Sequence, residues 1–378
     1  MIGNSMRSAT RRRAAVVVGA AVAALVGGLA ATPPSQAVAR AGAPVTVSRP
    51  DATIGSVRVL GPECPQAVSV TGADGITRGV ARCGTTLVRF TGSGRTWSHA
   101  SLGIEALPLA MAFDGRTTFV MATGARGLLL VRFAGTETPR TTLLDRQEDT
   151  QEAAIVARAG RYWAVWPRWG PANAHEDTSL YEARTLRGTV RPHALGLRGG
   201  SPSLVLQPGD VATLAWERPE AKHPSTIALA EDAGRGFRTV ALPKAYGGYP
   251  SLSADGSTLR LAYLASTGSP RVHPTTLLTR TADGRWHREP PFVSRPAGRV
   301  KVAGSAAGVV LAWEAHSTLD RIQVTVAVRL DTGRWVVRRL GVDAQVAGVG
   351  WNGRHAVVTW LEWGRLSKGP YTVHVDTF

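Results

Sequence analysis

Short runs of apolar and β-branched residues, separated by tight turns, recur along most of the chain. Helical periodicity is absent, so the pattern predicts short antiparallel strands. Glycine, Asn and Asp accept the positive φ that tight hairpin turns require. Turn pairs containing glycine stand at seven places, 40 to 52 residues apart: Asp74-Gly75, Asp114-Gly115, Ala159-Gly160, Gly209-Asp210, Asp255-Gly256, Ala307-Gly308 and Asn352-Gly353.

Large aromatic residues repeat with a similar period. Five successive units end the run after the turn with such a residue, at spacings of 50, 47, 50 and 47: Trp166, Trp216, Tyr263, Trp313 and Trp360. A second aromatic follows a Gly-Arg element at Trp97, Phe237, Trp286 and Trp335, and the last three are each 49 residues apart. Two independent markers therefore share one repeat.

Each unit is interpreted as four strands, a to d. In the fourth copy we expect them at residues 203–207, 211–216, 227–230 and 237–242. Radial repetition of such units is typical of a β-propeller with four to eight blades. We predict an all-β, seven-bladed propeller of four-stranded antiparallel blades, with six blades as the alternative.

The last unit runs out of chain after three strands, and an N-terminal segment supplies the fourth. Residues 56–61 match the preceding unit's outer strand, residues 336–341, at four of six positions. We therefore expect residues 55–60 to complete the seventh blade and close the ring, because an open ring would leave an exposed strand edge. The hairpin register around Asp74 also places Cys64 opposite Cys83, which predicts a disulfide.

The first 39 residues have the pattern of a secretory signal peptide. Arg7, Arg11, Arg12 and Arg13 precede an apolar run at 14–31, and Ala37-Val38-Ala39 offers a cleavage site. An uncleaved membrane anchor is the alternative. We expect residues 1–39 to be the signal peptide, 40–54 a flexible mature N-terminus and 55–378 a single propeller domain, without a membrane span after cleavage.

Charge and composition bear on partners. The chain of 378 residues carries a formal charge of +17, and removing the four arginines of the leader leaves +13. A basic exported protein attracts polyanions such as acidic polysaccharides, although a basic composition without a specific site is the simpler interpretation. We expect partners among acidic or neutral polysaccharides or cell-envelope proteins, no specific nucleic acid, no cofactor and no metal, and a monomeric state.

The connections between strands b and c gather polar and aromatic residues, and by analogy with other propellers they surround the channel mouth. Carboxylates could serve glycoside hydrolysis, or pair instead with Arg218 or Arg321. Loop histidines, including His175 and His273, could ligate a metal or act as bases, or simply be solvated. The repeated aromatics are most simply packing between blades. The ligand-binding candidates are Arg168, Trp169, Glu217, Arg218, His223, Glu314, His316, Glu362 and Trp363.

The turns between strands c and d resemble the Asp-box repeats of the sialidase-like (BNR) superfamily, Ser-x-Asp-x-Gly-x-Thr-Trp. Residues 232–237 keep the Asp, Gly and aromatic positions, and residues 94–97 keep the second half. The shorter segments 281–286 and 330–335 are variants. The resemblance implies the fold and repeat pattern and assigns no catalytic residue.

Rossmann, P-loop, zinc-protease and Gly-x-Ser-x-Gly signatures are absent from the sequence. We predict a secreted or cell-surface propeller that binds a glycan or protein ligand. The alternative is a glycan-active hydrolase or lyase that uses the carboxylates and histidines between strands b and c. A platform for protein interaction alone is the third class.

Overall fold

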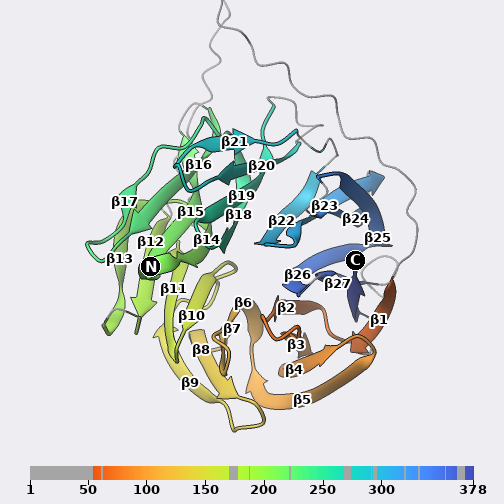
Figure 1. The fold of residues 1–378 in the computed structure, drawn as a ribbon. Coiled ribbons are helices and arrows are strands. Elements are labelled where there is room, and N and C mark those ends of the chain that lie inside the picture. The colour runs from red at the N-terminus through yellow and green to blue at the C-terminus, as the bar shows by residue number, and fades with distance from the viewer. Residues whose placement is uncertain are drawn as a thin grey trace, which may run out of the picture. The chain divides into compact units, whose positions relative to one another are not determined.

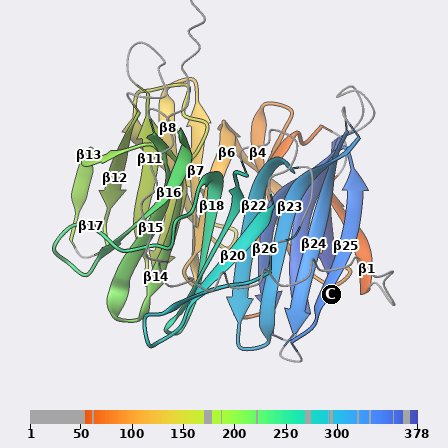
Figure 2. The ribbon, with the colours of Figure 1, turned by 90° about the horizontal axis from the view of Figure 1, so that it is seen from above.

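The computed structural model describes residues 54–60, 63–169, 178–186, 188–220, 223–267, 274–290, 292, 296–318, 321–330, 333–353, 355–363 and 371–378. These residues form a seven-bladed propeller whose seven sheets each contain four antiparallel strands. Figures 1 and 2 show the blades side by side around a central channel. The predicted seven blades are confirmed.

Blades 1 to 4 take their strands in chain order from the innermost outward. Blade 1 is β2 (Gln66–Thr71), β3 (Thr77–Cys83), β4 (Thr86–Ser93) and β5 (Thr96–Glu105). Blade 2 is β6 (Leu107–Phe113), β7 (Thr117–Gly124), β8 (Gly127–Ala134) and β9 (Arg140–Asp145). Blade 3 is β10 (Ala154–Arg158), β11 (Arg161–Arg168), β12 (Ser179–Arg184) and β13 (Val190–Arg198). Blade 4 is β14 (Gly200–Gln207), β15 (Val211–Glu220), β16 (His223–Asp232) and β17 (Arg238–Thr239), with a 3₁₀ turn at Pro208–Asp210.

Blades 5 and 6 follow the same order, and blade 7 combines both ends of the described chain. Blade 5 is β18 (Gly247–Asp255), β19 (Thr258–Ala265), β20 (Thr275–Arg280) and β21 (Trp286–Arg288). Blade 6 is β22 (Pro296–Ser305), β23 (Gly308–Thr318), β24 (Arg321–Leu330) and β25 (Trp335–Val342). Blade 7 is β26 (Ala344–Asn352), β27 (His355–Glu362), β28 (Thr372–Thr377) and β1 (Ile54–Leu60).

The N-terminal strand closes the ring as predicted. Strand β1 pairs antiparallel with β28, so that Ile54 lies opposite Thr377 and Leu60 opposite Val373 (Figure 1). The disulfide between Cys64 and Cys83 is also confirmed. Cys64 lies just before β2 rather than within it, so the disulfide ties the segment that follows β1 to the end of β3.

Seven apolar clusters hold the ring together, one at each boundary between blades. Middle strands are buried on both faces because each blade is covered by two neighbours; β7, for example, contains five consecutive buried residues. The repeated aromatics belong to these clusters: Trp166 lies with Phe119 of the preceding blade, and Trp216 with Trp163. Their interpretation as packing residues is therefore supported.

Two expectations about strand lengths were wrong. In blade 4, β15 continues to Glu220 and β16 begins at His223, so the long connection expected there is short. The outer strand β17 covers only Arg238–Thr239 instead of residues 237–242. Blade 6 shows the same extension, with β23 reaching Thr318 and β24 starting at Arg321. Polar residues sustain these ladders: Arg218 pairs with Thr226, and His316 with Ile322.

The turn that resembles an Asp box is built around one carboxylate. Asp232 Oδ1 accepts hydrogen bonds from the backbone N–H groups of Gly234, Arg235 and Gly236, the last two at 2.9 and 3.1 Å. In blade 5, Asp283 Oδ1 accepts one from the backbone of Arg285 at 3.1 Å. These aspartates hold turns, which agrees with the structural role of the resembling motif. No helix of the described residues is long and apolar enough to cross a membrane.

Candidate functional site

Polar side chains from several blades converge near the starts of the innermost strands. A cavity of about 70 Å³ is lined there by residues of five consecutive blades, from blade 2 to blade 6. We call five of its polar members the channel-mouth site: Glu152, Ser201, Tyr249, Arg299 and Lys301. Inner strands line the channel, and they begin at the end of the blades where strands b and c are connected. This placement agrees with the expectation that polar groups gather at that mouth.

Bulges near the starts of β14, β18 and β22 present Ser201, Tyr249 and Arg299. The pairing of β14 shifts register between Gly200 and Ser203, and that of β18 between Gly248 and Ser251. Ser201 and Tyr249 occupy the corresponding positions with φ of 48° and 56°. A non-glycine residue in this left-handed region is uncommon and often marks a functional or structurally constrained position. Tyr249 is 41% exposed, which is high for a large side chain on an inner strand.

Two carboxylates hold these bulged strands in place. Glu152 accepts hydrogen bonds from the backbone N–H of Ser201 at 2.6 Å and from its hydroxyl at 3.1 Å, which joins blade 3 to blade 4. Glu314 accepts from the backbone N–H groups of Arg299 and Val346, each at 3.2 Å, and so joins blade 6 to blade 7. Buried N–H groups need such acceptors because leaving them unsatisfied is costly.

Two glycines leave room for glutamate carboxylates beside the channel. A Cβ on Gly298 would stand 2.1 Å from Glu314 Oε2, and a Cβ on Gly248 would stand 2.8 Å from Glu217 Oε2. Both distances are too short for a larger residue to enter without a shift. Because both contacts are with the ends of glutamate side chains, a larger residue at either position would displace a carboxylate.

The electrostatics of the site raise the pKa of its tyrosine and lower the pKa of its lysine. Burial, with the negative charges of Glu152 and Glu217, raises the pKa of Tyr249. Burial and the positive charge of Arg299 lower the pKa of Lys301 to about 8, while Glu314 and Glu152 act in the opposite direction. A protonated phenol, a permanent cation and a titratable amine thus share one cavity, and such a group can bind an anionic sugar or exchange protons with it.

The structure brings together only some of the predicted candidates. Glu217 and Glu314 both lie close enough to Tyr249 to affect its pKa, although Glu314 is buried. Glu362, the third carboxylate of the expected group, instead pairs with His374 Nε2 of β28 at 3.2 Å. Arg218 pairs with Glu220 at 2.9 Å and does not take part in the cavity lining.

The remaining candidates occupy the same end of the blades outside the cavity lining. Arg168 lies 3.8 Å from Asp145 and 5.2 Å from the ring centroid of Tyr181. Trp169 and Trp363 follow directly after their strands and are half-buried. The backbone N–H of Trp363 donates to the carbonyl of Asp343 at 2.8 Å.

The histidines give less support for a metal or a base. His316 lies on β23, half-buried, with no hydrogen-bond partner for Nδ1 among the described residues. His223 begins β16, and the structure does not describe its side chain. His175 and His273 lie outside the described residues. Within the described part of the chain, no group of three or more His, Cys, Asp or Glu residues could hold a metal ion.

Tyr249, Arg299 and Lys301 were missed by the sequence analysis, although one signal was present. The segment Gly-Gly-x-Pro-Ser-Leu occurs twice, at residues 199–204 and 247–252, and its variable position holds Ser201 or Tyr249. This combination recurs although the rest of the repeat varies. Its recurrence indicates that the backbone conformation is constrained at this position. Arg299 follows only one glycine, so its segment matches this pattern only in part.

Comparison with known proteins identifies the fold and no family. No family model and no curated protein matches the sequence. The polysaccharide lyase Uly1 superposes with a TM-score of 0.54 at 8% identity, covering 91% of this chain and 94% of that one. The β-propeller domain of the Trilobed protease from Pyrococcus furiosus gives a TM-score of 0.51 at 9% identity, covering 83% and 94%. At these identities the likeness shows a shared propeller fold.

Proposed function

We propose that the protein binds a polysaccharide through the channel-mouth site, and that the sugar it prefers there is a uronic acid. The carrying observation is the convergence of Tyr249, Arg299 and Lys301 on one cavity. Tyrosine supplies an apolar ring face with a polar end. An arginine can hold a carboxylate through two parallel hydrogen bonds, and a lysine adds a point charge. A polysaccharide lyase has a similar fold, which is consistent with this ligand class.

The same groups support a second candidate function, β-elimination of a uronate polymer. Arg299 would neutralise the uronate carboxylate, and the neutral Lys301 amine would take the proton from C5. The C4–O bond would then break to form a C4–C5 double bond, and the Tyr249 phenol would protonate the departing oxygen. A lysine with a pKa of about 8 is suited to a general base, and a tyrosine with a raised pKa to an acid. Hydrolysis has less support, because Glu314 is buried and bonded to two backbone N–H groups.

Retention and cleavage separate the two functions. The purified protein is incubated with alginate, polygalacturonate and neutral dextran, while bound polymer and the ultraviolet absorbance of unsaturated uronate are followed. Retention of the uronates without new absorbance supports a binding module, and rising absorbance supports the lyase. Equal retention of dextran, or no retention of any polymer, overturns the uronate proposal.

A substitution then assigns the effect to the site. Arg299→Gln removes the proposed carboxylate ligand and should raise the Kd for a uronate polymer about tenfold. Arg238→Gln on β17 is the matched control, because it removes one exposed positive charge outside the channel. Equal losses in both variants would mean that net charge alone drives binding.

The remaining expectations about location and family stand as part of the proposal. Residues 1–39 direct export and are removed, residues 40–53 form the mature N-terminus, and the propeller domain follows from Ile54. The disulfide supports an extracellular location, since such bonds persist in oxidising compartments. Membership of the sialidase-like superfamily rests on the Asp-box-like turns of the sequence alone. Mass spectrometry of the exported protein would locate its N-terminus.

A further inference from the structure

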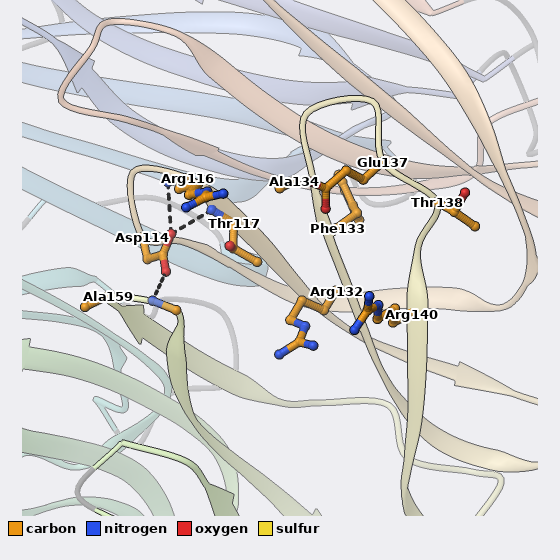
Figure 3. Close-up of a pocket in the computed structure, with 11 residues that line it drawn as sticks. Asp114, Arg116, Thr117, Arg132, Phe133, Ala134, Glu137, Thr138, Arg140 and Ala159 are labelled. Carbon is orange, nitrogen blue, oxygen red and sulfur yellow. Dashed lines mark hydrogen bonds between the residues drawn. The ribbon is translucent and has the colours of Figure 1, made fainter.

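A broader hollow lies at the other end of the blades, between the turns of blades 1, 2 and 3. It consists of two cavities of about 530 and 460 Å³, which share Arg116 and Phe133 in their walls (Figure 3). Both volumes fall within the range of small-molecule sites. We call this hollow the turn-face groove, because the turns between strands a and b and between strands c and d border it.

Positive charge dominates the groove. Its arginines are Arg78, Arg89, Arg116, Arg132 and Arg140, and its acidic residues are Asp114 and Glu137. Asp114 is already engaged by the backbone N–H groups of Arg116 at 2.9 Å, Thr117 at 2.7 Å and Gly160 (Figure 3). Burial opposes its ionisation, but these three donors outweigh that effect and lower the pKa of Asp114. The carboxylate thus fastens two turns together. Arg78 is paired with Asp74 at 2.6 Å, whereas no ion pair to a carboxylate joins the other four arginines within the described part of the chain.

Two of the arginines face each other across a strand pair. Arg132 of β8 lies directly opposite Arg140 of β9, and both are exposed. Like charges in directly opposed positions destabilise a sheet. Among the described residues, neither side chain forms an ion pair with a carboxylate. The arrangement leaves two guanidinium groups with free donors on one side of the groove (Figure 3).

The other wall of the groove holds arginines against aromatic rings. The guanidinium of Arg78 lies 3.8 Å from the ring centroid of Phe113, and that of Arg89 lies 5.9 Å from that of Phe133. Arg89 also donates to the carbonyl of Gly135. Contacts of this kind hold an arginine in place and lower the entropy lost when it binds a ligand. The groove is therefore partly organised before any ligand arrives.

We propose that the turn-face groove binds sulfate or phosphate esters carried on a polysaccharide. Each such ester offers several oxygens to the forked donors of an arginine, and two opposed arginines can hold one ester between them. A bound oxyanion would also relieve the repulsion between Arg132 and Arg140. This second site is independent of the uronate site, because it lies at the opposite end of the strands and shares none of its lining residues.

Two polymers test the proposal and identify the source of the ester. The purified full chain is titrated with dextran sulfate, a sulfated polymer without uronic acid, and with poly(glycerol phosphate), and each Kd is measured by calorimetry. We expect the variant Arg132→Gln/Arg140→Gln to bind the preferred polymer about tenfold more weakly or worse. The control Arg235→Gln/Arg238→Gln removes the same charge from exposed positions of blade 4 and should change the Kd less than twofold.

Thermal stability gives an independent measurement. The single variant Arg140→Gln should melt slightly above the parent protein without ligand, because the like-charge pair is gone, and should gain less stability when dextran sulfate or poly(glycerol phosphate) is added. Absence of binding to both polymers, or equal losses in the two double variants, overturns the proposal. Duplex DNA binding with equal affinity and equal dependence on Arg132 and Arg140 also overturns it, since the groove would then recognise polyanions in general.

Discussion

The two ends of the propeller blades differ in which charged side chains they present and in how these are paired. At the channel mouth, Glu152 and Glu314 bond to backbone N–H groups, and the lysine beside them has lost part of its basicity. In the turn-face groove, Arg132 and Arg140 are exposed and opposed without a carboxylate between them. The channel-mouth cavity is small, and hydrogen bonds hold the strands that line it. The groove is larger and carries exposed positive charge. Binding should therefore depend on geometry together with charge at the first end, and mainly on charge at the second.

Removing a buried carboxylate at the channel mouth should have the largest effect. Glu314→Ala leaves the N–H groups of Arg299 and Val346 without an acceptor and creates a cavity at a buried position. We expect a loss of about 3 kcal/mol in the free energy of unfolding, measured with urea. Glu137→Ala, at an exposed position of the groove, should change it by less than about 0.5 kcal/mol. Similar losses in both variants would contradict the contrast between the two ends.

Removing an aromatic ring should separate the two ends by ligand. Tyr249→Ala should weaken uronate binding about tenfold through the loss of ring contact and leave dextran sulfate binding unchanged. Tyr246→Ala is the control, since Tyr246 is 39% exposed against 41% for Tyr249 and lies outside the cavity lining. Calorimetry with both polymers checks the result. A loss of dextran sulfate affinity in the Tyr249 variant would show that the two sites are coupled.

The pH dependence of ligand affinity should also differ between the two ends. The Lys301 amine is charged below a pKa of about 8, so uronate binding should be strong at pH 7 and weaken as the pH rises through 8. Arginines stay protonated over this range, and binding in the groove should therefore stay constant. Affinities measured from pH 6.5 to 9.5 provide the comparison. The variant Lys301→Met should remove the pH dependence at the channel mouth, and its persistence would point to another titrating group.

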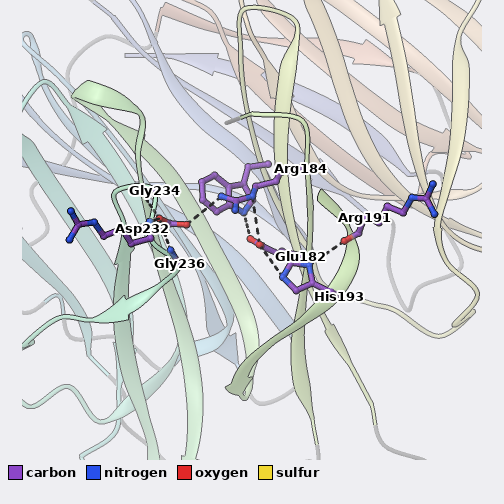
Figure 4. A network of polar contacts seen from close by, with 9 residues as sticks. Glu182, Arg184, Arg191, His193, Asp232, Gly234 and Gly236 are labelled. Carbon is purple, nitrogen blue, oxygen red and sulfur yellow. Dashed lines mark hydrogen bonds and ion pairs between the residues drawn. The ribbon is translucent and has the colours of Figure 1, made fainter. Parts of the chain in front are cut away.

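The smallest effect is expected at a buried glutamate that belongs to neither site. Glu182 is buried at the boundary of blades 3 and 4, where it accepts a hydrogen bond from Trp163 Nε1 at 2.5 Å and lies 3.8 Å from Arg184 and 3.4 Å from His193 (Figure 4). Burial raises its pKa above the ordinary value of 4.5, despite these donors and cations. Its contribution to stability is therefore complete below pH 4.5 and is lost as the pH rises through the raised pKa.

Glu182→Gln should abolish that loss. The variant keeps a hydrogen-bond acceptor for Trp163 and has no proton to release, so its melting temperature should fall less than that of the parent as the pH rises from 4 to 7. Differential scanning calorimetry across this range measures the difference. Parallel curves for the two proteins would mean that Glu182 titrates alike in the folded and unfolded states.

The fold could be predicted from the sequence because its markers are local and repeated. A glycine turn and a strand-end aromatic such as Trp216 each mark one position within a blade, and the common period fixes the number of blades. The ends of strands were harder to predict. The apolar run stops at Trp216, but the backbone ladder continues through Glu217 and Arg218, since hydrogen bonds between strands do not depend on apolar side chains.

The candidate site was only partly predicted, for a reason of geometry. Glu217 and Glu314 were recognised because they follow repeated tryptophans. Tyr249 and Arg299 approach them from other strands, and their convergence depends on the bulges and on the width of the channel. The opposition of Arg132 and Arg140 likewise requires the exact register of β8 and β9. Neither this convergence nor this opposition can be recognised within a short stretch of the sequence.

Closure of blade 7 also sets the order in which the molecule can be completed. Strand β1 is among the first parts of the propeller to be synthesised, yet its partner β28 lies at the other end of the chain, with Ile54 opposite Thr377. Pairing between such distant segments is slow, because a very long loop must be closed. During synthesis, six blades can therefore assemble while the seventh waits for its earliest strand to return, and the ring becomes continuous only when the final residues are available.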